Sequence, residues 1–149
     1  GDLAKPTPGQ KLRLLISAQK DSDGANLDRL QVVKGWLDNH GKRREKVFNV
    51  AWSDQRRSNS RGKIPQLPST VDGAGYTNRY GSPSLSTVWQ DPEFDPNQHA
   101  FYYVRVLEIE TPTWLAYDKA RYGDAAAIPD DAVLSHQERA YSSPIWYTP

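Results

Sequence analysis

The sequence predicts a mainly β protein, an immunoglobulin-like β-sandwich of about six to eight antiparallel strands with long loops and one short helix. Short runs of β-branched and aromatic residues recur along the chain, turn residues separate them, and no strand–helix–strand alternation occurs. The 149 residues suit one domain. We expect this domain to span residues 11–149, behind a linker at residues 1–10 that holds Pro6, Pro8 and Gly9.

The clearest strand signal lies at residues 100–110, the longest run of β-branched and aromatic residues in the chain. Both faces of this segment are mainly apolar. One face carries Tyr102, Val104 and Val106, and the other carries Phe101, Tyr103, Arg105, Leu107 and Ile109. Because a strand with two apolar faces is typical of a sheet covered on both sides, we expect a central strand between two layers.

Alternation of apolar and polar residues also predicts strands at residues 11–17, 27–37, 46–52, 85–89 and 139–147. The segments before and after Asp38-Asn39-His40-Gly41 predict a hairpin, since Asn and Gly tolerate positive φ. Pro144 restricts part of the last strand to a sheet edge. Residues 113–123 predict the short helix, ended by Gly123.

Residues 53–80 differ from the rest of the chain. They are rich in Ser, Arg, Gly, Pro and Asn and show little periodicity. A connection of this length without regular structure is unusual inside a compact domain. We therefore expect the segment to be mobile, or to be held by contacts from outside this chain.

Composition excludes several classes of function. The formal net charge of +1 gives no overall field that favours nucleic acid. We expect the basic residues around the hairpin and after it to be solvated; they are Lys42, Arg43, Arg44, Lys46, Arg56, Arg57, Arg61 and Lys63. The absence of cysteine excludes disulfides, thiol catalysis and thiolate metal sites. No apolar run approaches the roughly 20 residues of a membrane-spanning helix.

One segment resembles part of a calcium-binding loop. Asp21 and Asp23 alternate before Gly24, and Asp28 follows. Calcium binds six to eight oxygen ligands, and the segment lacks the third alternate Asp and the closing Glu of an EF-hand. The simpler interpretation is an Asx-type turn between strands. We expect no cofactor, with Ca²⁺ at Asp21, Asp23 and Asp28 as the alternative.

No catalytic residue is predicted. His40, His99 and His136 are isolated in or beside loops, and no Gly-x-Ser-x-Gly or phosphate-binding motif occurs. Aromatic residues are the remaining candidates for binding, because exposed rings stack on sugars or anchor protein partners. Trp36, Trp52 and Trp89 lie at strand spacing and are expected in the core. Tyr76, Tyr80 and Trp114 lie in irregular or helical stretches and are the predicted binding residues.

Five segments together resemble one bacterial family. They are GANLDRLQVVKGWLD at 24–38, KVFNVAWSD at 46–54, GSPSLSTVWQDPEFDP at 81–96, AFYYVRVLEI at 100–109 and ERAYSSPIWYTP at 138–149. From about Leu12 to Pro149 the chain resembles the C-terminal region of the domain of unknown function family 3604. This resemblance implies a longer, exported bacterial protein whose N-terminal part is similar to PHP-type (polymerase and histidinol phosphatase) metal-dependent hydrolases. The closing Ser-Pro-Ile-Trp-Tyr is similar to the last strand of β-sandwich tails behind some of these enzymes.

The resemblance therefore implies a non-catalytic accessory module in the periplasm or outside the cell. It would pack on or cap an N-terminal catalytic domain of the same polypeptide. The metal ligands of PHP-type enzymes do not carry over to this chain, because it has no His-x-His segment. The alternative is a module that binds carbohydrate through Tyr76, Tyr80 and Trp114.

Overall fold

The computed structural model describes residues 11–149 and confirms a mainly β fold. Its strands are β1 (Arg13–Gln19), β2 (Leu27–Leu37), β3 (Arg43–Trp52), β4 (Val71–Asp72), β5 (Gly75–Tyr76), β6 (Ser84–Gln90), β7 (Ala100–Pro112), β8 (Ser135–Tyr141) and β9 (Ile145–Tyr147). The helix α1 (Trp114–Tyr122) follows β7 and continues into a 3₁₀ turn at Gly123–Ala126. The predicted linker at 1–10 lies outside the described residues.

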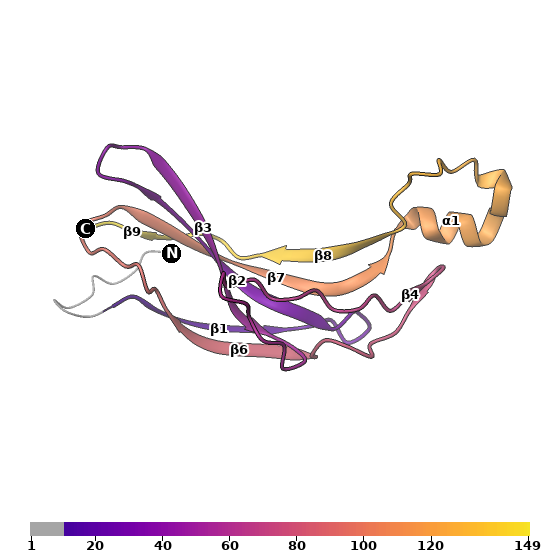
Figure 1. Cartoon of the computed structure of the whole chain (residues 1–149), viewed down its shortest axis with the longest axis horizontal. Coiled ribbons are helices and arrows are strands. Elements are labelled where there is room, and N and C mark those ends of the chain that lie inside the picture. Colours follow the sequence, from indigo (N-terminus) through magenta and orange to yellow (C-terminus); the bar gives the residue numbers. More distant parts are fainter. Residues whose placement is uncertain (1–10) are drawn as a thin grey trace.

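The strands form two layers. The larger sheet has the order β3-β2-β7-β8, and β9 pairs with β7 on the same edge as β8. The smaller sheet pairs β1 with β6, and it lies beneath the larger one in Figure 1. In an immunoglobulin-like sandwich the strands C′, C, F and G form one sheet, whereas B and E belong to the other. The order β3-β2-β7-β8 corresponds to C′-C-F-G, and the pair β1-β6 corresponds to B-E. The predicted sandwich is therefore confirmed.

Strand β7 is central, as predicted, because it pairs with β2 on one side and with β8 and β9 on the other. Only one face of the larger sheet packs against β1 and β6. The core between the layers consists of Leu12, Leu14, Ile16, Leu30, Val32, Ala100, Tyr102 and Tyr147. Trp36 and Trp89 pack against this core, as expected, whereas Trp52 donates its indole N–H to the carbonyl of Arg56. The third sheet, the two-stranded β4–β5, also contacts β7, and within residues 11–149 no larger sheet is present to cover the opposite face, so a full second layer as expected is not formed.

A buried polar bridge joins the two layers. Lys34 of β2 and Asp91, which follows β6, are 2 % and 0 % exposed, and their Nζ and Oδ2 atoms lie 2.7 Å apart. The Tyr102 hydroxyl of β7 donates to the same carboxylate oxygen at 2.7 Å. Burial raises the pKa of Tyr102, and the hydrogen bond to Asp91 raises it further. Tyr102 therefore stays a neutral donor, and every charged atom of the bridge has a partner.

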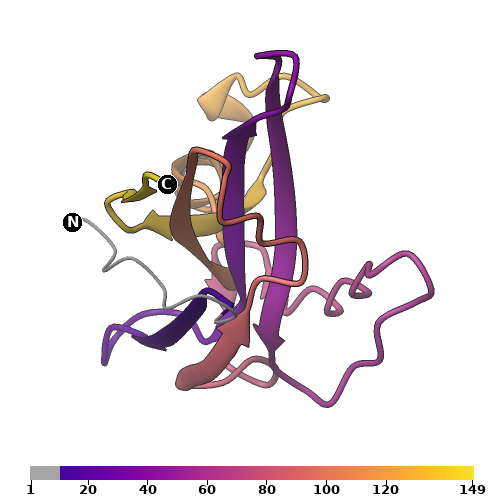
Figure 2. The same ribbon diagram turned by 90° about the vertical axis from the view of Figure 1, so that its left-hand side faces the viewer.

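Contacts within the chain anchor the segment 53–80 at several points, and its expected mobility stays a prediction. The Gly81 N–H donates to Asp54 Oδ2 at 2.8 Å and closes the base of the segment. Arg56 pairs with the buried carboxylate of Asp28 and donates to the Pro65 carbonyl at 2.8 Å. Ile64 is buried. Figure 2 shows the segment as a long magenta excursion to one side of the β2–β3 hairpin; the short β4–β5 hairpin lies near its end.

The predicted elements differ from the observed ones mainly at their ends. The β2–β3 hairpin and α1 are confirmed, and Gly123 ends the helix with φ 55°. The predicted last strand, 139–147, is divided into β8 and β9 around Pro144, which has no N–H to donate. Strand β8 begins earlier than predicted, at Ser135.

The buried bridge predicts a large effect of Lys34→Met on stability. The variant leaves the Asp91 carboxylate buried without its cation, so we expect the free energy of unfolding to fall by about 3–5 kcal/mol. Lys46 lies directly across from Lys34 and pairs with Glu93 at 45 % and 46 % exposure. Lys46→Met is the matched control and should cost less than about 1 kcal/mol. Urea denaturation measures the stability of both variants. Equal losses would contradict the role of the buried bridge in stability.

The anchored segment predicts an effect of Arg56→Gln on local opening. The variant loses the charge-assisted bonds to Asp28, worth about 1.5–3 kcal/mol. We expect amide exchange to accelerate across residues 56–66 while the exchange of β7 changes less. Arg57 is exposed and serves as the control through Arg57→Gln. Unchanged exchange in Arg56→Gln would show that other contacts hold the segment.

Candidate functional site

The face of the larger sheet opposite β1 and β6, here called the outer face, is the candidate site. Cross-strand pairing places Gly35 of β2 beside Phe101 of β7, and Phe101 beside Trp146 of β9. Further along, Arg105 of β7 lies between Gln31 of β2 and Tyr141 of β8. Because side chains alternate along a strand, these residues share the face that the smaller sheet does not cover.

Four rings form a continuous row on the outer face, in the order Trp146, Phe101, Tyr103 and Tyr141. Neighbouring ring centroids are 5.3, 6.4 and 6.2 Å apart, and the planes of Phe101 and Tyr103 differ by 8°. Trp146 and Tyr141 are 54 % and 57 % exposed. Val33, on the same face, is only 1 % exposed. The rings of this aromatic row thus take the place of a covering layer.

Gly35 makes room for the aromatic row. A Cβ at this position would lie 2.3 Å from Cζ of Phe101, so the Phe101 ring lies over the glycine backbone. Beside it is a hollow of about 680 Å³, lined mainly by apolar groups that include Leu37, Phe101 and Trp146. Leu37 is 45 % exposed. Polar residues also line this hollow, namely His99, Arg43, Arg44 and Glu45.

A polar row crosses the sheet next to the tyrosines. Arg105 donates from Nε to Gln31 Oε1 at 2.8 Å, and Gln31 donates from Nε2 to Asn49 Oδ1 at 2.8 Å. Asn49 donates in turn to the carbonyl of Gly62 at 3.1 Å. The outer face therefore has three zones. These are the apolar hollow, the polar row with Tyr103 and Tyr141, and the end that the segment 53–80 covers.

A protein-family model described as "Protein of unknown function (DUF3604)" matches residues 1–149, the whole chain. The chain belongs to this family. The comparison with curated proteins found no match, and the comparison with solved structures found none either. Membership of the DUF3604 family confirms the resemblance seen in the sequence and assigns no activity. Among residues 11–149 no helix is long and apolar enough to cross a membrane.

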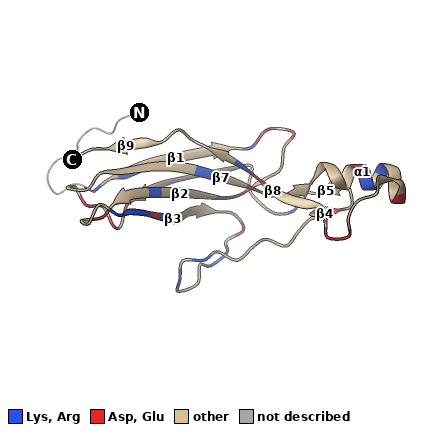
Figure 3. Ribbon diagram, turned by 90° about the horizontal axis from the view of Figure 1, so that it is seen from above, with Lys and Arg blue, Asp and Glu red and all other residues tan. Residues whose placement is uncertain are grey.

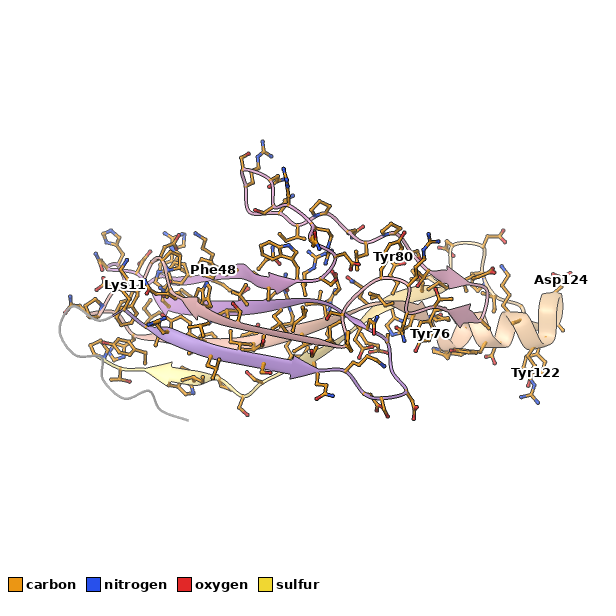
Figure 4. All side chains as sticks on the ribbon, turned by 90° about the horizontal axis from the view of Figure 1, so that it is seen from below. Lys11, Phe48, Tyr76, Tyr80, Tyr122 and Asp124 are labelled. Atoms are coloured by element: carbon orange, nitrogen blue, oxygen red, sulfur yellow. The ribbon has the colours of Figure 1, made fainter. Side chains whose placement is uncertain are left out.

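The three aromatic residues predicted from the sequence do not form one site in this DUF3604 chain. Tyr76 lies in β5, and the guanidinium of Arg79 lies over the Tyr80 ring at 5.7 Å. Trp114 begins α1 and is 71 % exposed. Figure 4 labels Tyr76 and Tyr80 toward the α1 end of the body, opposite Lys11. No ring contact joins the three within the described part of the chain, so they form no shared platform.

The acidic residues proposed for Ca²⁺ are separated. Asp23 donates its N–H to Asp21 Oδ1 at 3.0 Å, which is the Asx-type turn. The Lys20 ammonium bonds the backbone carbonyls of Asp21, Ser22 and Gly24. Asp28 is fully buried, and Arg29, Arg56 and Gln137 bind its carboxylate. In residues 11–149 no group of three His, Asp or Glu side chains is suited to a metal ion.

Two carboxylates with shifted pKa values lie away from the outer face. Backbone N–H groups of Lys42 and His40, together with Arg44, lower the pKa of Asp38 in the hairpin turn. Partial burial raises the pKa of Glu108, and the neighbouring charge of Glu138 adds to this shift. Figure 3 shows Lys and Arg along β3 and the segment 53–80, interspersed with acidic groups. These groups are paired or dispersed and form no second site.

The packing of Phe101 over Gly35 predicts an effect of Gly35→Ala. The added methyl must displace the ring, and we expect the free energy of unfolding to fall by about 1–3 kcal/mol. Near-UV circular dichroism should change because Phe101 contacts Trp146. Gly75→Ala is the matched control, since its Cβ would meet only the Asp72 carbonyl at 3.5 Å. Equal stability of the two variants would contradict this packing.

Proposed function

We propose that the chain is a non-catalytic accessory module of a longer, exported bacterial protein, and that its hollow docks a neighbouring domain of the same polypeptide. The observation that carries this proposal is the uncovered apolar hollow at Leu37, Phe101 and Trp146. A contiguous apolar surface exposed to water is unfavourable and marks interaction sites in soluble proteins. Docking would bury the exposed ring of Trp146, and aromatic residues of this kind are enriched at interfaces.

The course of the chain supports a covalently linked partner. Leu12, at the start of the described chain, packs in the same core cluster as Tyr147 of β9. Tyr147 and Thr148 line the hollow, and Figure 1 shows the C-terminus at the end opposite α1. A domain joined on the N-terminal side of Leu12 would be held near the hollow, which raises its effective concentration there.

Catalysis in this proposal belongs to the neighbouring domain. The resemblance favours a PHP-type hydrolase, in which His and Asp side chains hold divalent metals that activate water. In the present chain His40 lies in the hairpin turn, His99 lines the hollow, and His136 contacts Glu138 on β8. These three residues lie on separate elements. The family resemblance and the cysteine-free sequence support a periplasmic or extracellular location.

The docking proposal predicts the effect of Leu37→Asp in the longer polypeptide. A charge in the hollow should separate the two domains, because docking would have to remove water from the carboxylate. We expect amide exchange at residues 145–148 to become at least tenfold faster in the variant than in the parent polypeptide. Hydrogen-exchange mass spectrometry measures this difference.

The matched control is Val88→Asp, because Val88 is 56 % exposed on β6 of the other layer. This variant should keep the slow exchange at residues 145–148. Fast exchange at these residues in the parent polypeptide itself would overturn the docking proposal.

A further inference from the structure

Arg105 occupies an unusual place on the outer face. Its side chain is half-buried in the middle of the central strand β7, and within residues 11–149 its one partner is the neutral amide of Gln31, which accepts from Nε. The ion pairs among residues 11–149 use other cations, so Arg105 has no carboxylate partner within the described chain. The two terminal guanidinium nitrogens are therefore available to a ligand. Partly desolvated charges without a counter-ion are costly, which favours an anion at this point.

The polar row holds this guanidinium in place. Gln31 accepts from Nε and is itself fixed by Asn49, which bonds the backbone of the segment 53–80. Gln31 is 9 % exposed, so the support lies within the protein. A guanidinium fixed through Nε presents its remaining N–H groups as a planar fork, which matches the two oxygens of a carboxylate. Such fixation lowers the entropy cost of binding.

Two tyrosines lie beside Arg105 on the outer face. Tyr103 precedes Arg105 by two positions on the same face, and Tyr141 is its cross-strand partner. Their ring centroids lie 6.2 Å apart, and neither hydroxyl has a hydrogen-bond partner among residues 11–149. Aromatic rings stack on the C–H faces of sugars, and free phenol hydroxyls bond sugar hydroxyls. The site thus combines one carboxylate-binding group with two stacking groups.

We propose that Arg105, Tyr103 and Tyr141 form a binding site for an acidic glycan, a sugar chain that carries carboxylates. A nucleic acid would require several cations along its backbone, and the neighbours of Arg105 in the polar row are neutral amides. The site is separate from the residues that test docking, Leu37 and Trp146, and it goes beyond the proposed accessory role. The proposed carbohydrate site thus lies on the larger sheet and not at Tyr76, Tyr80 and Trp114.

Calorimetric titration of the 149-residue chain with oligogalacturonate tests the proposal. Saturable binding is expected, with no comparable binding of neutral oligogalactose of the same length or of acetate. Arg105→Gln should weaken binding at least tenfold, and Tyr141→Ala, at an exposed position, should weaken it several-fold. Arg105→Lys keeps the positive charge but loses the paired N–H groups of the guanidinium, so it should bind with intermediate affinity.

Two controls separate this site from the rest of the molecule. Arg44→Gln removes a basic residue that pairs with Asp38, and Trp146→Ala removes a ring of the hollow; both should bind as the parent chain does. Thermal unfolding verifies that each variant is folded. No saturation in the millimolar range would overturn the proposal. Equal affinity for the neutral glycan or acetate, or full affinity of folded Arg105→Gln, would also overturn it.

Discussion

The arrangement of this sandwich depends on the bridge between Lys34, Asp91 and Tyr102. A buried ammonium is strongly unfavourable unless a carboxylate neutralises it, so Lys34 is confined to the side of β2 where Asp91 lies. Residues on a strand alternate between faces, and a shift by one position would reverse all of them. By fixing Lys34 inward, the bridge also fixes Val33 and Gly35 outward. The composition of the outer face thus follows from an interaction on the inner one.

A sheet with one covered face must still keep its other face from water. This protein does so in two ways. The segment 53–80, anchored by Arg56 on Asp28, covers one end of the outer face with Ile64. The aromatic row shields the other part, where Phe101 lies over Gly35. Shielding by rings that are themselves half-exposed leaves an apolar surface available to a partner, whereas a full second layer would not.

The positions of the strands could be predicted from the sequence, whereas the contacts of each strand with distant parts of the chain could not. Alternation identified β2, β3 and β7, because it reflects local contacts along each strand. It could not show whether a layer covers Phe101 and Tyr103, since apolar faces look alike when covered by a sheet or by their own rings. Asp28 was grouped with Asp21 by local spacing, yet its partners Arg56 and Gln137 are 28 and 109 residues away. Only the folded chain brings such distant groups together, and the same holds for Arg105 and Tyr141.

The two proposed uses of the outer face are compatible, and each would favour the other. Phe101 lies between the hollow and Tyr103, so a domain docked at Trp146 would end close to the polar row. Ligand sites occur preferentially where domains meet, because two surfaces enclose more of the ligand than one. A glycan bound at Arg105 would then contact the neighbouring domain and favour the docked arrangement. By linkage, docking would raise glycan affinity by the same factor, so the longer polypeptide should bind more tightly than the module by itself.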